Sequence, residues 1–199
     1  SLARPSNYEV LQKLATLQMS TKKFEDAKQT LEKLVALEVI SGTRDGILEQ
    51  LAVVYRELGD QDAEMQTLRE VVEITSDAVP ALESLIDRSR ERKDWPGLAG
   101  WGHRVLAIQP LRELGHQALV DAGKQLDRPD WVARGTIALL QLDPIDEAGL
   151  HFTCAEALAK LGQVEEAKQH VLLALADAPR YRAAHRLLYQ LSGYESDDK

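Results

Sequence analysis

Three X-Pro pairs recur along the chain at nearly equal spacing, and this period constrains the fold more than any other feature of the sequence. Gln109-Pro110, Asp143-Pro144 and Ala178-Pro179 each follow an apolar run, and the prolines are 34 and then 35 residues apart. Proline lacks the amide hydrogen that a helix interior needs, and its ring clashes with the preceding turn, so each pair predicts a helix boundary. Boundaries at a fixed spacing predict an internal repeat.

Each repeat is predicted to consist of two helices joined by a tight turn. Residues 155–161 follow a helical pattern, Gly162 marks its end, and a second pattern then places Ala167 and Ala174 on one helical face. The same layout recurs around Gly59. The sequence therefore predicts an all-α chain built from helical hairpins.

These hairpins resemble tetratricopeptide repeats, which are helix-turn-helix units of roughly 34 residues. Five repeats align over nearly the whole chain. The tightest position of their first helices holds Ala15, Ala52, Ile86, Val120 and Ala155. The resemblance implies a right-handed superhelical solenoid, in which small side chains let neighbouring helices approach closely.

The aligned repeats also predict the domain organisation. We expect a single repeat domain over residues 1–192 and a polar tail at 193–199. The approximate limits of the repeats are 8–41, 45–78, 79–111, 112–145 and 146–180. Residues 181–192 are expected to form a capping helix that covers the last open face.

Two repeats depart from the family pattern in their second helix. Glu64 stands where the family usually has alanine, which predicts loose packing or a one-residue shift of register in the second repeat. In the fourth repeat, alignment on Pro144 puts Val132 at this position, whereas alignment on Trp131 puts Arg134 there. The sequence leaves both alignments open.

Charge and composition exclude several classes of partner. The net charge is −8, whereas binding to a phosphate backbone needs clustered lysine and arginine, so we expect no nucleic acid partner. The single cysteine cannot form an internal disulfide. No apolar run is long enough to cross a membrane, so we expect no membrane insertion and a cytoplasmic location.

The sequence contains no constellation typical of an enzyme. The five histidines lack the i, i+4 pairing with a glutamate that a helical zinc site requires, and no Gly-rich phosphate loop is present. Cys154 falls on the inward face beside Ala155, which predicts a buried, unreactive thiol. We therefore expect a protein that is not an enzyme and that binds no metal and no cofactor.

The resemblance also implies that the first helices line a concave groove. The side chains predicted to face this groove are Gln12, Thr16, Glu49, Val53, Arg56, Glu83, Asp87, Arg90, Gln117, Asp121, Lys124, Phe152, Glu156 and Lys160. Opposite charges recur on equivalent faces of consecutive repeats. One interpretation is a groove for an extended polar peptide or a partner helix. The other is an inter-repeat ladder of ion pairs that bind only each other.

Phe152 is the candidate anchor of the groove. Leu150 and Cys154 are expected to take the core on the other side of its helix, which leaves the aromatic ring for a partner. The alternative interpretation is that Phe152 packs against the preceding repeat.

Some tetratricopeptide domains bind the C-terminal carboxylates of chaperones through a clamp of lysine and asparagine side chains. The corresponding positions of this chain hold Gln12, Thr16, Gln50, Pro80 and Ser84. None of these side chains is cationic, so we expect no chaperone-tail carboxylate clamp.

The resemblance, together with the lack of catalytic residues, implies a non-catalytic scaffold for protein–protein interaction that binds a protein or peptide segment in the groove. An alternative is the accessory C-terminal repeat region of a larger enzyme, for example a hydrolase, which positions or recruits rather than reacts. The start of the sequence at Ser1 without a methionine motivates this alternative.

Overall fold

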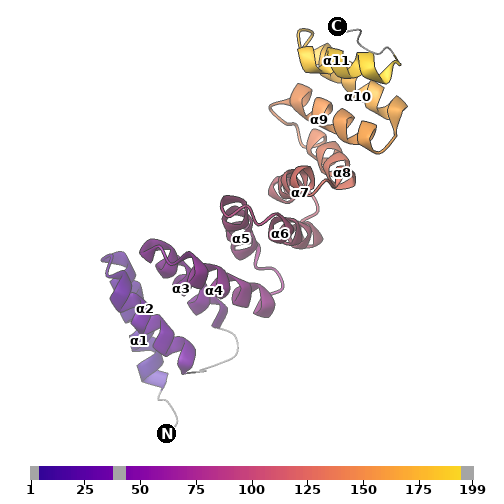
Figure 1. Ribbon diagram of the computed structural model, residues 1–199. Helices are drawn as coiled ribbons and strands as arrows, with labels where there is room; N and C mark the ends of the chain where they lie inside the picture. Colours follow the sequence, from indigo (N-terminus) through magenta and orange to yellow (C-terminus); the bar gives the residue numbers. More distant parts are fainter. Residues whose placement is uncertain (1–4, 38–43, 194–199) are drawn as a thin grey trace. The chain divides into compact units, whose positions relative to one another are not determined.

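The computed structural model describes residues 5–37 and 44–193, and over these residues it contains eleven α-helices and no β-strand. The all-α class predicted from the sequence is therefore confirmed. In chain order the helices are α1 (Pro5–Ser20), α2 (Phe24–Ala36), α3 (Arg44–Leu58), α4 (Gln61–Ile74), α5 (Val79–Glu91), α6 (Trp95–Ile108), α7 (Glu113–Gln125), α8 (Pro129–Leu140), α9 (Glu147–Lys160), α10 (Val164–Asp177) and α11 (Arg182–Leu191) (Figure 1). The end of the first predicted repeat, residues 38–41, and most of the predicted tail lie outside the described residues.

The chain divides into two compact units, Ser1–Arg88 and Ser89–Lys199. In the first unit, α1 packs against α2, α2 against α3 and α3 against α4; in the second, each helix from α6 to α10 packs against the next, and α10 against α11 (Figure 1). Within each unit, these helices that follow one another along the chain are thus neighbours in space. This arrangement is the one expected of stacked hairpins.

Each hairpin turns through one residue with positive φ. These residues are Lys22, Gly59, Lys93, Asp127 and Gly162, with φ between 51° and 76°. Their spacing of 37, 34, 34 and 35 residues equals the spacing of the small first-helix positions. The repeat period read from the sequence is therefore present in the backbone, even where the turn residue is not glycine.

One buried position also recurs in the second helix of each hairpin. It holds Ala27, Glu64, Leu98, Val132 and Ala167, all buried. Val132 is buried, whereas the side chain of Arg134 is 75% exposed. The fourth repeat therefore aligns on Pro144 rather than on Trp131.

Glu64 occupies the recurring buried position of the second helix, so the register of the second repeat is not shifted. Its side chain is fully buried, and its two carboxylate oxygens accept from the Nε atoms of Arg56, at 2.7 Å, and Arg88, at 2.8 Å. Arg56 also donates to the Ser84 hydroxyl at 3.1 Å. A buried carboxylate is costly unless it is paired, and here two arginines from the flanking helices α3 and α5 pair it. The expectation of loose packing or a shifted register at this position was wrong.

Glycine allows α7 and α8 to approach each other closely. A Cβ atom on Gly135 would lie 2.7 Å from Cγ2 of Val120, and one on Gly123 would lie 2.9 Å from Cγ2 of Val132. Both distances are shorter than the contact distance of two carbon atoms. The two glycines therefore set the separation of these helices, which carry two walls of the candidate site.

None of the helices in the described ranges has the length and the apolar character needed to cross a membrane.

Candidate protein-binding surface

The side chains predicted to face the groove lie on first helices in both units. The first unit holds Gln12, Thr16, Glu49, Val53, Arg56, Glu83 and Asp87, and the second holds Arg90, Gln117, Asp121, Lys124, Phe152, Glu156 and Lys160. All of them are exposed or half-buried, and none is buried. Each unit therefore presents its share of these side chains to solvent.

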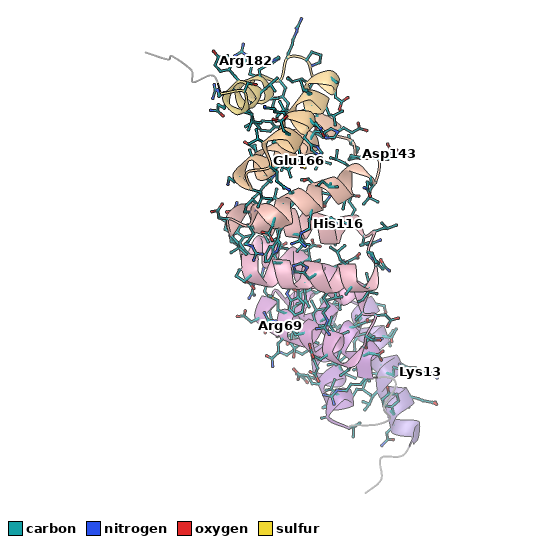
Figure 2. The ribbon with its side chains drawn as sticks, turned by 90° about the vertical axis from the view of Figure 1, so that its right-hand side faces the viewer. Lys13, Arg69, His116, Asp143, Glu166 and Arg182 are labelled. Carbon is teal, nitrogen blue, oxygen red and sulfur yellow. The ribbon has the colours of Figure 1, made fainter. Side chains whose placement is uncertain are left out.

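The second unit has a large hollow between α7, α9 and the loop that joins α8 to α9. The volume of this large hollow is about 760 Å³, and Asp143 lies on its loop (Figure 2). Its lining residues are Arg90, Glu113, Gln117, Val120, Asp121, Lys124, Leu139, Pro144, Ile145, Asp146, Gly149, Leu150, Thr153 and Tyr181. The lining is mixed, with about as many polar and charged side chains as apolar ones, so it suits a polar segment that carries an apolar side chain.

A small hollow of about 160 Å³ adjoins the large one. Its lining residues are Gly123, Lys124, Asp127, Pro129, Val132, Thr153, Glu156, Ala157 and Lys160. Lys124 and Thr153 line both hollows. The two hollows therefore share a wall along α7 and α9, and we call them together the α7–α9 surface.

The charged groups of the α7–α9 surface are partly paired with each other. The Arg90 Nε atom lies 3.1 Å from Asp121 Oδ2, and Lys160 Nζ lies 3.3 Å from Asp127 Oδ1. In the part of the chain that the structure describes, Lys124 makes no hydrogen bond and no ion pair. The ammonium of Lys124, which stands at the shared wall, is thus available to a partner.

Phe152 packs within the second unit, toward the C-terminal helices. It is half-buried, it packs against the buried cluster of Ala155, Val171 and Ala184, and its ring centroid lies 4.9 Å from that of Tyr181. Phe152 lines neither hollow, whereas Tyr181 lines the large one. Its use as an anchor stays a prediction.

Ten of the fourteen lining residues of the large hollow were not among the side chains predicted to face the groove, including Ile145, Leu150 and Tyr181. A signal for Ile145 was present, because the residues that follow Pro110 and Pro144 are both apolar. Leu111 is 75% exposed and Ile145 is fully exposed. Large apolar side chains at equivalent, exposed loop positions are a better indication of a contact surface than of a core.

The histidines have structural contacts. His116, labelled in Figure 2, and His185 each place Nε2 within 2.9 Å of the carbonyl oxygen of Pro110 or Pro179, six residues earlier in both cases. The ring N–H therefore donates to the loop before the helix and fixes the start of that helix. No group of three or more potential metal ligands occurs within the described ranges.

His151 and His170 form a pair between α9 and α10, with their Nδ1 atoms 2.9 Å apart. One ring must donate an N–H and the other must accept, so the pair cannot keep this bond when both rings are protonated. Burial, and then the neighbouring His151, lowers the pKa of His170 from 6.5. The folded chain therefore favours the neutral form of His170.

This pair predicts a pH-dependent stability. Because the pKa of His170 is lower in the folded chain than in the unfolded one, the unfolded chain takes up its proton first as the pH falls below about 6.5. We expect the contribution of the pair to the free energy of unfolding to be complete above that pH. This contribution is expected to be lost as the pH falls toward the folded-state pKa of His170. Urea unfolding of the wild type and of His170→Asn between about pH 8 and pH 5 measures it. Identical pH profiles of the two proteins would contradict the prediction.

Cys154 is poorly placed for catalysis. Its side chain is fully buried, and burial raises the pKa of its thiol. A buried, protonated thiol is a weak nucleophile. The sequence-based expectation of a buried cysteine is confirmed.

Comparison with known proteins agrees with this architecture. Two family models described as tetratricopeptide repeat match residues 9–37 and 46–77. No curated protein matches the chain.

Solved structures share the fold at low sequence identity. A tetratricopeptide repeat protein from Parabacteroides merdae has a TM-score of 0.62 and 14% identity, with 95% of this chain and 75% of that chain covered. MamA from Desulfovibrio magneticus RS-1 has a TM-score of 0.58 and 14% identity, with 90% and 99% covered. YrrB, described as a tetratricopeptide repeat protein with an unusual peptide-binding site, has a TM-score of 0.60 and 13% identity, with 87% and 88% covered.

Proposed function

We propose that this chain, a tetratricopeptide repeat protein, is a non-catalytic scaffold that binds an extended segment of a partner protein on the α7–α9 surface. The observation that carries the proposal is the pair of adjoining hollows on the first helices of the second unit. A volume of about 760 Å³ is sufficient for several side chains of a peptide. The peptide-binding site named for YrrB, which has the same fold, adds support by analogy.

The lining of the two hollows indicates the chemistry of the segment. Val120, Ile145 and Leu150 would receive an apolar side chain in the large hollow. Lys124 at the shared wall would bind a carboxylate or a backbone carbonyl of the partner, because its ammonium has no partner within the described chain. The segment is therefore expected to place an acidic residue near an apolar anchor.

The remaining functional expectations belong to the same proposal. The net charge of −8 disfavours nucleic acid as a partner. Gln12, Thr16 and Ser84 provide no cationic clamp for a chaperone tail. A protein that is not an enzyme and needs no cofactor also belongs to this proposal.

Selection of a random peptide library on the immobilised chain tests the proposal. We expect the selected peptides to lose about tenfold or more in affinity when Ile145→Asp removes the apolar wall or Lys124→Glu reverses the free charge. Both side chains are exposed, so neither change disturbs the core. Isothermal titration calorimetry with the best peptide gives the affinities.

Leu172→Asp is the matched control. Like Ile145, Leu172 is an exposed aliphatic residue of the second unit; it is 55% exposed on α10, but it lines neither hollow. The control is expected to bind the peptide as the wild type does. Equal affinity of all three variants, or an equal loss in the control, would refute binding at the α7–α9 surface.

A further inference from the structure

Thr153 of α9 differs from the other threonines that lie inside helices in the described ranges. The hydroxyls of Thr16, Thr30, Thr67 and Thr136 each donate to the backbone carbonyl oxygen four residues earlier, at 3.0, 3.0, 2.8 and 2.7 Å. A helical threonine commonly satisfies its hydroxyl in this way. Thr153 makes neither this bond nor any other side-chain hydrogen bond within the described chain. Its hydroxyl is therefore available to a ligand.

Thr153 lies on the wall that the two hollows of the α7–α9 surface share. Within the described ranges, Thr153 and Lys124 are the residues that line both hollows. The ammonium of Lys124 likewise has no hydrogen bond and no ion pair with the described chain. The shared wall thus offers a hydroxyl from α9 and a cation from α7, and neither is used by the fold.

A cation and a hydroxyl suit a carboxylate better than a backbone carbonyl. Both groups donate hydrogen bonds, and a carboxylate can accept one on each of its two oxygens, whereas a carbonyl has a single oxygen. A carboxylate also neutralises the ammonium, and charge-assisted hydrogen bonds are roughly twice as strong as neutral ones. The neighbouring cations are less available, because Arg90 pairs with Asp121 and Lys160 pairs with Asp127.

Glu156 limits where a carboxylate can lie. Its side chain lines the small hollow but not the large one, and it makes no hydrogen bond and no ion pair within the described chain. An acidic side chain placed in the small hollow would meet this like charge and be repelled. A run of acidic residues therefore fits the α7–α9 surface poorly, and a single one at the shared wall fits best.

The place of the shared wall between the two hollows favours an internal acidic residue over a chain terminus. A segment whose carboxylate side chain lies at the wall continues in both directions, so that neighbouring side chains can enter the large and the small hollow. A chain that ends at the wall in a C-terminal carboxylate continues in one direction only. More apolar surface is therefore covered by a segment that carries its acidic residue internally.

We propose that Lys124 and Thr153 form a carboxylate subsite that selects segments with a single internal aspartate or glutamate beside an apolar residue. The subsite rests on the proposed function, because it names the chemistry of the segment that the α7–α9 surface binds. Lys124 supplies the charge, and the hydroxyl of Thr153 donates to the second oxygen. The apolar neighbour enters the large hollow against Val120, Ile145 and Leu150.

Selection from a random peptide library on phage tests the subsite. The C-terminus of each displayed peptide is joined to the coat protein, so no free terminal carboxylate is presented. We expect peptides selected on the wild type to be enriched in one aspartate or glutamate beside an apolar residue. Peptides selected on Lys124→Met are expected to lose this enrichment. Lys168→Met is the matched control, because Lys168 lies on α10 outside both hollows, and it is expected to keep the enrichment.

Calorimetry with the best wild-type peptide, made synthetically, measures the contribution of each donor. Replacing its acidic residue by the corresponding amide is expected to weaken binding to the wild type about tenfold, and binding to Lys124→Met by about twofold or less. Thr153→Val is expected to reduce the tenfold preference for the acid to about threefold. Thr153→Ser keeps the hydroxyl and is expected to keep the preference. A free and an amidated C-terminus of the peptide are expected to give equal affinities.

The outcomes separate the subsite from the proposed function. Peptides that need Ile145 but show no acidic preference, or keep that preference on Lys124→Met, would overturn the subsite and leave the binding surface in place. A loss of affinity on amidation of the C-terminus, without a loss on replacement of the internal acid, would overturn it in favour of a terminal carboxylate. If no selected peptide depends on Ile145, the proposed function fails and the subsite fails with it.

Discussion

Replacing both Arg56 and Arg88 with methionine is expected to lower the free energy of unfolding by about 3–5 kcal/mol. The double variant keeps Glu64, whose side chain is fully buried and accepts from both guanidinium groups. Without them the carboxylate has neither water nor a cation, and its desolvation is no longer offset. Urea unfolding followed by circular dichroism measures the change.

A third substitution separates the loss of charge pairing from the loss of packing. Adding Glu64→Leu to the double variant removes the unpaired charge and places at this position the residue that α6 has in Leu98. Replacement of a complete buried ion group by apolar residues is often neutral, so we expect the triple variant to regain most of the lost stability. A double variant as stable as the wild type would show that Glu64 does not depend on the arginines.

The close approach of α7 and α8 predicts the second large effect. Gly135→Ala adds a Cβ atom that would lie 2.7 Å from Val120 Cγ2 and 3.1 Å from the His116 carbonyl oxygen. The helices must separate to accept it, and such overpacking costs about 1–3 kcal/mol. Thermal unfolding of the variant checks this value.

Gly100→Ala is the matched control for Gly135→Ala. Gly100 is an exposed residue inside α6, and a Cβ atom there would have no neighbour within 4 Å. The control is expected to gain about 0.5–1 kcal/mol, because alanine favours the helix over glycine. Destabilisation by both substitutions, or by neither, would contradict the role assigned to Gly135.

The spacing of the prolines was sufficient to predict the hairpins, because a helix boundary depends on local chemistry. The conformation of the turns could be predicted from the residue type at only some positions. Gly59 and Gly162 mark two of the five left-handed turn residues, whereas Lys22, Lys93 and Asp127 adopt the same conformation without any signal in the residue type. Packing of the two helices of each hairpin holds these residues in a conformation that is costly for a residue with a side chain.

Contacts between helices that are distant in sequence could not be predicted. Glu64 was recognised as a departure, but Arg88, which pairs with it, is 24 residues away on another helix. The choice between Val132 and Arg134 likewise depended on which side of α8 meets α9. Gly123 and Gly135 carried a usable signal, because glycine inside a helical pattern often marks a close packing contact.

The candidate site was predicted in part for the same reason. Helical periodicity selected side chains such as Lys124 and Glu156, which do line the hollows. It could not select Ile145, which lies on a loop, or Tyr181, which approaches from the start of the last helix. The hollows form where residues from several helices and a loop meet, whereas helical periodicity describes the faces of one helix at a time.

Binding of a polypeptide segment to the first-helix face of the second unit can be observed in the methyl chemical shifts of the chain during titration with a peptide selected from a random library. We expect shifts at Ile145, Leu150 and Val120 and unchanged methyl groups at Leu172 and Leu173 on α10. Shifts confined to the α10 leucines, with Ile145 and Leu150 unchanged, would contradict it.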